Sequence, residues 1–431
     1  MLRSRALVVG ALAAGLLTPA VATAQDPSYP EPKDPGAVTP APSGKGKTLR
    51  VCKRGCRFTK IQAAVDKAKA GDTVKVKNGT YREAVRVRGA KKSYLKLVGN
   101  ARAPAKVLLK GGGGKQNGVL VDGADEVTVR GFKAKGYAAN GFFFVNVVGY
   151  TARDLIAAKS GVYRVYAFNF KGGMMRDSEA YYHSDAGFYI GQTPAQDTPT
   201  RSIVRNVESW GNPVGWSGTN MRYVTISGSR FYNNGIGLVP NALDSEKFPP
   251  AEDNVIRGNE IFWNNFNFHE GVPFKPKSSG VVPLVPIGTG LLLLGGRRNL
   301  VEDNRGYGNY AMGVAAVEAI LLEENPQARA LIGNVVRDNA FGLEGTDLNG
   351  RDLAYDGNGT ANCFGPNSGV AVTIPASGST LSPCPFDGAN AFSAAAQAEM
   401  VSFTGKAAVA AWIKHPHAPK PGYTPLELYK P

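Results

Sequence analysis

The stretch Gly118–Gly131, GVLVDGADEVTVRG, is followed by three segments that keep its pattern. They begin at residues 141, 164 and 187 and read GFFFVNVVGYTARD, RVYAFNFKGGMMRD and GFYIGQT, so the interval is 23 residues each time. Each unit is a short strand that can bury one face but cannot do so alone. Stacking the units into a solenoid buries all of them, and we therefore expect Gly118, Gly141 and Gly187 to lie along one axis.

Later units repeat with insertions, and their composition distinguishes between two kinds of solenoid. A period near 23 residues also suits leucine-rich repeats, but these units lack that leucine frame and are rich in Asn, Gly and β-branched residues. That composition favours a parallel β-helix. We expect four asparagines to occupy equivalent turn positions and to hydrogen-bond between coils. They are Asn206, Asn259, Asn304 and Asn339.

Residues 61–85, IQAAVDKAKAGDTVKVKNGTYREAV, show a helical period followed by an alternating strand. This run resembles the N-terminal cap of the pectate-lyase-like superfamily, in which a short helix covers the first coil. The turn SDAGFYIGQT at Ser184–Thr193 is similar to repeat turns of its secreted bacterial members. The resemblance covers about residues 48–345 and implies an all-β fold, a right-handed parallel β-helix with a short N-terminal capping helix.

The chain divides into four expected regions. Residues 1–24 read as a signal peptide, with Arg3 and Arg5, an apolar run, and an A-x-A site at residues 22–24, so we expect a secreted protein, extracellular or associated with the cell surface. Residues 25–47 hold many prolines and are expected to be a disordered linker. The β-helix is expected over 48–345, with a C-terminal cap and extended tail over 346–431. No later segment reaches 18 apolar residues, so no transmembrane segment is expected.

The charge balance suggests a partner. The formal net charge is +16, and removing residues 1–24 takes away two arginines and no acids, which leaves 48 minus 34, or +14. Colloidal solubility is one reading of this charge. The other is attraction to an acidic polysaccharide or an anionic cell-wall polymer. Nucleic acid is not expected as a partner of an exported protein, and we expect a monomer.

The four cysteines form two local pairs, Cys52 with Cys56 and Cys363 with Cys384. In an exported protein this favours two disulfides, and the spacing fits no usual zinc pattern. The loop at residues 352–363 is rich in oxygen ligands but lacks the alternating acidic ligands of an EF-hand. No cofactor or metal is therefore expected, and calcium has weak support only.

The stretch YYHSD, Tyr181–Asp185, adds ionisable groups to a turn that reads AKSGV one period earlier. These groups suit β-elimination or C5 epimerisation of a uronate, which needs a cation on the carboxylate, a base and an acid. The candidate catalytic residues are His183 as base, Tyr181 or Tyr182 as acid, Asp185 to orient the histidine, and Arg176 as the cation. The alternative is that His183 is a surface histidine in a polar turn.

Substrate contacts are expected from residues near this turn and in the insertions after residue 238. The candidates are Trp210, Trp216, Arg153 and His269, although buried packing is an equal alternative for each tryptophan. Characterised members of the resembled superfamily act on polyuronates as lyases, epimerases, hydrolases or esterases. The YYHSD turn lacks the proline and first aspartate of the DPHD turn of mannuronan epimerases. The sequence predicts a secreted protein that acts on or binds acidic polysaccharide, as a polyuronate lyase or C5-epimerase, or as a non-catalytic glycan-binding surface or matrix protein.

Overall fold

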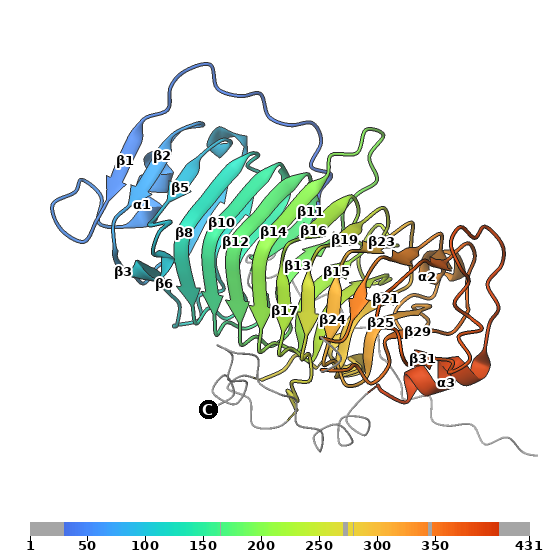
Figure 1. Cartoon of the computed structure of the whole chain (residues 1–431). Coiled ribbons are helices and arrows are strands. Elements are labelled where there is room, and N and C mark those ends of the chain that lie inside the picture. The colour runs from blue at the N-terminus through green and yellow to red at the C-terminus, as the bar shows by residue number, and fades with distance from the viewer. Residues whose placement is uncertain (1–29, 164, 270–274, 279, 344–346, 405–431) are drawn as a thin grey trace, which may run out of the picture. The chain divides into compact units, whose positions relative to one another are not determined.

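The computed structural model describes residues 30–163, 165–269, 275–278, 280–343 and 347–404. The chain forms two units, Met1–Glu31 and Pro32–Pro431, and the strands all belong to the second. Two long parallel sheets, of 18 and 11 strands, run through this unit (Figure 1). The all-β parallel β-helix expected from the sequence is confirmed. The signal peptide expected over residues 1–24 lies outside the described residues.

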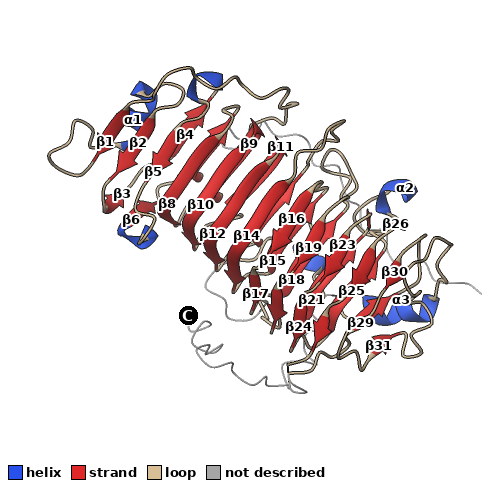
Figure 2. Ribbon diagram, turned by 45° about the horizontal axis from the view of Figure 1, so that its top comes forward, coloured by secondary structure: helices blue, strands red, loops and turns tan. Residues whose placement is uncertain are grey.

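Strands of the two sheets alternate along the chain, as the coils of a solenoid require (Figure 2). The 18-stranded sheet contains β1 (Thr48–Val51), β2 (Thr73–Val76), β3 (Gly79–Tyr81), β5 (Lys96–Val98), β6 (Val107–Lys110), β8 (Val127–Lys135), β10 (Tyr150–Ala158), β12 (Gly173–Tyr181), β14 (Ser202–Trp210), β16 (Val224–Ser227), β17 (Arg230–Tyr232), β19 (Val255–Arg257), β20 (Glu260–Phe262), β23 (Leu300–Glu302), β24 (Arg305–Tyr307), β27 (Val335–Arg337), β28 (Ala340–Phe341) and β30 (Cys363–Phe364). The 11-stranded sheet contains β4 (Val85–Arg88), β7 (Asn117–Asp122), β9 (Asn140–Val148), β11 (Val165–Lys171), β13 (Ala186–Gly191), β15 (Val214–Thr219), β18 (Ile236–Asn241), β21 (Thr289–Leu294), β25 (Met312–Val317), β29 (Leu353–Tyr355) and β31 (Thr373–Ile374). Strands β22 (Gly296–Arg297) and β26 (Leu331–Ile332) form a separate pair.

Helices lie at both ends of the strand order. Helix α1 (Ile61–Lys67) packs on β1, β2 and β4 and is the capping helix that the sequence predicted. The Glu83 carboxylate accepts the N–H groups of Ile61 and Gln62 and so caps its first turn. Helix α3 (Ala394–Val401) packs on β29 and β31. The remaining helical segments are α2 (Pro326–Arg329), η1 (Ala90–Lys92), η2 (Pro104–Lys106) and η3 (Val282–Leu284).

The strand register confirms the 23-residue repeat. Val165 pairs with Phe142 on one side and Phe188 on the other. Gly118 lies opposite Gly141, between two paired positions, and Gly187 lies opposite Gly215 in the same way. Arg164, which holds this position in the third unit, lies outside the described residues. The glycine row therefore stacks along one axis, as expected.

The glycine row is required by close backbone approach. A Cβ atom on Gly118 would stand 2.5 Å from the carbonyl oxygen of Gly141, and one on Gly215 would stand 2.5 Å from that of Gly237. Both oxygens belong to backbone that is fixed in the ladder. At the glycine positions of this row, a larger residue would therefore displace the next coil.

Asparagine side chains connect successive turns inside the coils. Asn259 donates its Nδ2 to Asn304 Oδ1 at 2.9 Å, and Asn304 donates to Asn339 Oδ1 at 2.9 Å. The same Oδ1 of Asn304 also accepts the backbone N–H of Asn259, and Asn259 Nδ2 reaches the carbonyl of Ile226. The ladder expected at Asn259, Asn304 and Asn339 is confirmed.

Asn206 does not belong to this ladder. Arg205 and Arg257 both pair with Ser227, so Asn206 aligns with Gly258, one residue before Asn259. Asn206 has a φ of 51° and forms part of a bend in the sheet, where its Nδ2 donates to Asp177 Oδ1. Gly131, Asp154 and Asp177 occupy the same bend in β8, β10 and β12 with positive φ, a conformation that Gly, Asn and Asp adopt most easily.

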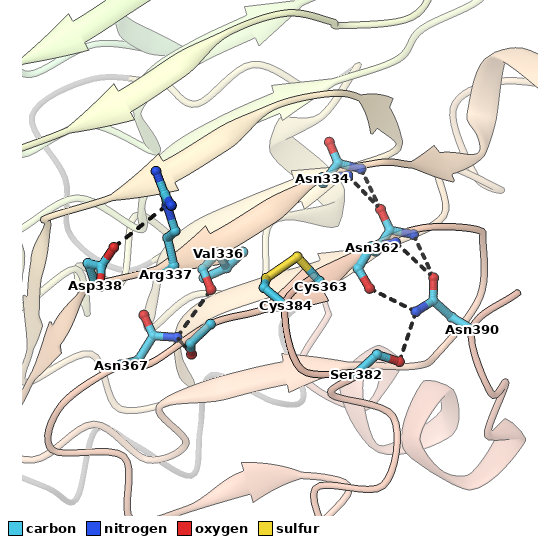
Figure 3. The surroundings of a disulfide bond; sticks show 11 residues. Asn334, Val336, Arg337, Asp338, Asn362, Cys363, Asn367, Ser382, Cys384 and Asn390 are labelled. Carbon is cyan, nitrogen blue, oxygen red and sulfur yellow. Dashed lines mark hydrogen bonds and ion pairs between the residues drawn. A yellow bond between two sulfur atoms is a disulfide. The ribbon is translucent and has the colours of Figure 1, made fainter. Parts of the chain in front are cut away.

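Both expected disulfides are present, Cys52–Cys56 and Cys363–Cys384. The second joins β30 to the segment that follows it (Figure 3). Beside it, a second ladder runs from Asn334 through Asn362 to Asn390. The disulfide therefore fastens the last described coils where that ladder ends.

The C-terminal boundary of the β-helix differs from that expected. Strands β29, β30 and β31 continue the parallel pairing, so the β-helix extends past residue 345 to Ile374. An insertion between the last two units hid this continuation of the repeat.

Among the described residues, no helix is long and apolar enough to cross a membrane.

The described part of the Pro-rich segment departs from the disorder expected from its composition. The N–H and Oγ1 of Thr39 donate to Asp125, and the N–H of Lys47 donates to Asp72. The backbone of Lys33 bonds to Asn146 and Asn169. Hydrogen bonds to side chains of the coils hold this segment, which has little apolar surface of its own to bury.

The glycine row leads to a first prediction. We expect Gly215→Ala to lower the free energy of unfolding by about 1–3 kcal/mol, the usual cost of forcing atoms into a packed interior. Denaturant unfolding of the purified protein measures this change. Gly44→Ala is the matched control, because a Cβ atom there meets no other atom within 4 Å. Equal stability of the two variants would contradict the requirement for glycine where the next coil approaches closely.

Candidate functional site

The residues of the YYHSD turn face in different directions. Tyr181 ends β12, and Tyr182 has a φ of 59° at the corner that follows. Because Tyr181 pairs with Trp210, His183 aligns with Asn212. Asn212 donates to Asn234 in an inner asparagine ladder, so His183 occupies a ladder position. Its side chain has no exposed surface. The expectation of a catalytic base is corrected accordingly, since a polymer outside the coil would not reach His183.

Asp185 anchors a distant segment and does not orient a catalytic group. Its carboxylate lies 3.2 Å from Lys277 Nζ, and the N–H of Lys277 donates to the carbonyl of Ser184 at 2.6 Å. The Lys277 ammonium is also 3.5 Å from the Tyr163 hydroxyl. Burial raises the pKa of Asp185, while Lys277 and Tyr163 oppose that shift. The segment at residues 275–278 is therefore fixed against the start of β13.

A second segment is fixed beside it through Glu246. The Tyr189 hydroxyl donates to Glu246 Oε1 at 2.5 Å, and the second oxygen of Glu246 is buried without a hydrogen-bond partner in the described structure. The Tyr189 ring lies 4.4 Å from that of Tyr163 and 4.8 Å from that of Tyr166. Burial raises the pKa of Glu246 to about 7. Sequence reasoning identified these insertions but did not show that they contact Tyr189 of β13 and residues that precede β11 and β13.

The outer face of the 18-stranded sheet gathers a different set of groups, which we call the carboxylate–tyrosine cluster. In one row, Glu179 pairs with Glu208 and Glu208 with Arg230. Two residues further on, Tyr181 pairs with Trp210 and Trp210 with Tyr232. Neighbouring rungs are about 4.8 Å apart. The cluster comprises Lys133, Glu179, Tyr181, Glu208, Trp210, Arg230 and Tyr232.

Polar contacts join these side chains. Lys133 Nζ donates to the Tyr181 hydroxyl at 3.0 Å. Trp210 Nε1 donates to Glu179 Oε1 at 3.0 Å, and Arg230 Nη2 lies 2.9 Å from Glu208 Oε1. The strands β8, β12, β14 and β17 thus each contribute to one polar surface. Tyr181 and Trp210 were predicted from the sequence, whereas Lys133, Glu179, Glu208 and Arg230 were missed.

The two carboxylates of the cluster have different surroundings. Burial raises the pKa of Glu179, the Trp210 N–H lowers it, and the nearby charge of Glu208 raises it again. The positive charge of Lys133 also lowers the pKa of Glu179. Glu208 is instead ion-paired with Arg230, and its side chain keeps 32% of its surface exposed. Burial thus shifts the pKa of the Glu179 carboxyl group upward, while the Glu208 carboxylate is paired with a cation.

The two predicted tryptophans are held in aromatic packing. The Trp210 ring stacks on Tyr181 with centroids 4.4 Å apart and planes 6° apart, and it packs on the buried cluster that includes Tyr232. Its faces are thus used inside an aromatic row. Trp216 is fully buried and stacks with Phe188. The expectation that Trp216 contacts substrate is corrected, because its position in β15 points into the coil.

Arg153 and Arg176 belong to a row that lies across the bend from the cluster. Arg130, Arg153, Arg176 and Arg205 pair in register along β8, β10, β12 and β14. Arg130 pairs with Asp154 at 2.8 Å, and Arg176 pairs with Asp177 at 2.8 Å. Because Asp177 forms the bend, Arg176 stands on a different part of the strand from Tyr181. The expected set of Arg176, His183 and Tyr181 does not converge.

His269 lies in the segment after β20 and is exposed. Its ring is 4.4 Å from that of Phe268, and its N–H is bonded to Asn267. These contacts do not bring His269 to the carboxylate–tyrosine cluster.

A basic groove of about 620 Å³ lies near the N-terminal end of the same sheet. Five cationic side chains and two asparagines line it, together with Val76, Gly99 and Ala101, and no acidic residue does. The cations are Arg50, Lys75, Lys77, Arg102 and Arg130. Of these, only Arg130 forms an ion pair with a described residue. Arg50 in residues 48–51 and the alternating Lys75 and Lys77 in residues 73–77 were the sequence signal for this groove.

The described residues hold no group of three or more His, Cys, Asp or Glu side chains that could bind a metal ion. The carboxylates of Asp352 and Asp356, in the loop at 352–363, accept hydrogen bonds from backbone N–H groups. Asp352 accepts the N–H groups of Ala371 and Val372, and Asp356 accepts that of Asn358. These bonds give the acidic residues of the loop a structural use.

The surroundings of Glu246 predict a pH dependence of stability. Its folded-state pKa of about 7 exceeds the ordinary value of 4.5, so the folded protein retains a proton that the unfolded chain loses. We expect stability to be highest below about pH 4.5 for this group and to fall as the pH rises to about 7, by roughly 1–3 kcal/mol. Denaturant unfolding at pH 5 and pH 8 measures it.

Glu246→Gln should remove most of this difference, because a glutamine does not titrate. Glu324→Gln, at an exposed position, is the matched control and should keep the wild-type pH dependence. An unchanged pH dependence in Glu246→Gln would show that the carboxyl group does not titrate in this way.

No protein-family model matches the chain, and no curated protein does either. Among solved structures, the Mannuronan C-5 epimerase AlgE6 A-module of Azotobacter vinelandii is 16% identical, with a TM-score of 0.48 over 72% of this chain and 89% of that one. An alginate lyase from Paenibacillus sp. is 13% identical, with a TM-score of 0.40 over 78% of this chain and 97% of that one. A pectate lyase, Pel9A, is 14% identical, with a TM-score of 0.33 over 77% and 78%. The chain's own strand pairing gives it the parallel β-helix architecture that the resemblance of residues 61–85 implied.

Proposed function

We propose that the protein is exported and binds an acidic polysaccharide on the outer face of the 18-stranded sheet, with the basic groove as the main contact. The observation that carries this proposal is the composition of the groove. Five cations line it without a carboxylate, and four of them form no ion pair with a described residue. A polyanion is the partner that such a surface attracts.

The arrangement of the cations suits a chain with repeating charge. Arg50 pairs with Lys75, and the same row continues through Val98 to Arg130. Rungs are about 4.8 Å apart. Carboxylates of an extended acidic chain can therefore meet Arg50 and Lys75 on neighbouring rungs and Arg130 two rungs further on. Beyond Arg130, Arg153 and Arg176 are paired with Asp154 and Asp177, which reduces their attraction for an added anion. The groove is therefore the strongest cationic contact on this face.

A second candidate function, polyuronate lyase or C5-epimerase, draws its support from the contact between Tyr181 and Lys133. The hydroxyl of Tyr181 accepts a hydrogen bond from the ammonium, which leaves its own proton available to a leaving oxygen. His183 does not contribute, because it is buried in a ladder position. A non-catalytic glycan-binding protein would use the groove alone.

Neutralising the groove tests the binding proposal. We expect the triple variant Arg50→Gln, Lys75→Gln, Arg102→Gln to bind pectate or alginate about tenfold more weakly at low salt, because each lost ion pair is worth roughly 0.3–1 kcal/mol. Isothermal titration calorimetry against each polymer measures the affinity. The variant's binding should also depend less on salt concentration.

The matched control removes three exposed cations outside the groove, Lys91→Gln, Lys247→Gln and Arg257→Gln. It should lose much less affinity for the same change in net charge. Equal losses in both triple variants would mean that net charge, and not the groove, governs binding. Binding of neutral dextran as tightly as pectate would refute the proposal.

Elimination is tested separately by following the ultraviolet absorbance of the unsaturated uronate product. Tyr181→Phe should abolish any absorbance increase while it preserves binding at the groove. Exchange of the C5 proton with deuterated water, without absorbance, would indicate epimerisation.

A further inference from the structure

We propose that Glu179 and Glu208 form an acid and nucleophile pair that hydrolyses a glycosidic bond in a polysaccharide lying over the carboxylate–tyrosine cluster. This inference rests on the proposed function, because the basic groove supplies the binding of the acidic chain. It assigns to the same sheet face a reaction class that differs from elimination and epimerisation.

The first argument is spacing. Glu179 and Glu208 are register partners on β12 and β14, so their backbones are one rung, about 4.8 Å, apart. Glu179 bonds to Trp210 on β14, and Glu208 bonds to Arg230 on β17. Two side chains of equal length on neighbouring rungs can hold their carboxyl groups at about the rung spacing. That separation is close to the roughly 5–5.5 Å of glycosidases that retain anomeric configuration, and shorter than the roughly 6.5–9.5 Å of inverting ones.

The second argument is that the pair breaks the charge pattern of its row. After Glu208 the row continues Arg230, Glu260 and Arg305, so opposite charges alternate along the solenoid. Glu179 instead stands directly beside Glu208. Like charges on facing positions destabilise a sheet, so a purely structural row would place a cation at residue 179. The acidic pair is the position where this row departs from what stability favours.

The third argument is the difference between the two surroundings. Glu179 faces the Trp210 indole, Glu208 and Lys133, whose ammonium is bonded to Tyr181, and its burial favours the protonated acid. Glu208 faces Arg230 and the Tyr232 hydroxyl, which lies 3.5 Å from Oε2. Two neighbouring carboxyl groups in such different environments are suited to donate a proton and to attack as an anion, respectively.

The reaction proceeds in two balanced steps. Glu179 gives its proton to the glycosidic oxygen as the bond from that oxygen to the anomeric carbon breaks, and a Glu208 oxygen forms a new bond to the same carbon. In the second step a water oxygen attacks the anomeric carbon, its proton passes to the Glu179 carboxylate, and the bond to Glu208 breaks. The products are a new reducing end and a new hydroxyl, and both glutamates return to their starting states.

The full chain is tested with pectate, alginate and hyaluronate in ¹⁸O-labelled water. We expect new reducing ends that carry ¹⁸O, released with retained anomeric configuration by NMR, from at least one polymer that binds. Glu179→Gln and Glu208→Gln should each lower the rate by about a hundredfold or more. Glu260→Gln, on the same row, is the matched control and should stay near the wild-type rate.

Two further readouts separate chemistry from a loss of structure. Azide added to Glu208→Ala should restore bond cleavage and yield a glycosyl azide, which a merely structural glutamate would not do. The alkaline limb of the rate profile, which reports deprotonation of Glu179, should disappear in Glu179→Gln. Circular dichroism checks that each variant is folded.

Three outcomes overturn the inference. They are no new reducing ends from any polymer that binds, an unsaturated product without ¹⁸O, and normal rates in both glutamine variants. The first leaves the binding proposal intact, since affinity for the groove is measured independently. If none of the three polymers binds, the proposed function fails and the inference fails with it.

Discussion

The structure depends on one constraint, that the polar backbone of every buried turn must be satisfied by the next coil. The asparagine ladders meet it, because a single Oδ1 accepts both the side-chain amide and the backbone N–H of the preceding coil, as Asn304 does for Asn259. These two hydrogen bonds to one oxygen form only if successive turns lie in register. Each ladder therefore fixes where the next coil begins, and the glycine row excludes any side chain that would separate the coils.

Strict register has a consequence for the surface. Positions that are equivalent in successive coils become neighbours one rung apart. A residue type that is repeated in the sequence at these positions therefore forms a continuous row of similar side chains. The arginine row from Arg130 to Arg205 and the aromatic row from Tyr181 to Tyr307 are formed in this way. A repeated row can form an extended surface of one charge, as Arg50 and Lys75 do in the basic groove. A local departure arises where a row breaks its pattern, as the neighbouring Glu179 and Glu208 break the alternation of charge.

The sequence predicted the architecture well because its pattern is periodic. A 23-residue interval, a capping helix at residues 61–67 and paired cysteines each specify local geometry that the structure reproduces. The site could not be predicted in the same way, because side-chain direction depends on one-residue details of the corner. His183 follows Tyr182, whose positive φ closes the corner and places the imidazole inside the coil. Glu179 and Glu208 are 29 residues apart, and an insertion between their coils conceals that they are register partners.

The segment at residues 33–47 introduces a contact unlike those between coils. Neighbouring coils in the regular part of the repeat pair residues 23 apart, whereas the backbone of Lys33 bonds to Asn146 and Asn169, 113 and 136 residues away. Contacts at such separation form after local ones, because the chain between them must first be ordered. The segment emerges first but can dock only when the coils that contain Asn146 and Asn169 have formed. Once docked it bridges several coils, so unwinding the solenoid coil by coil from its beginning first requires its release.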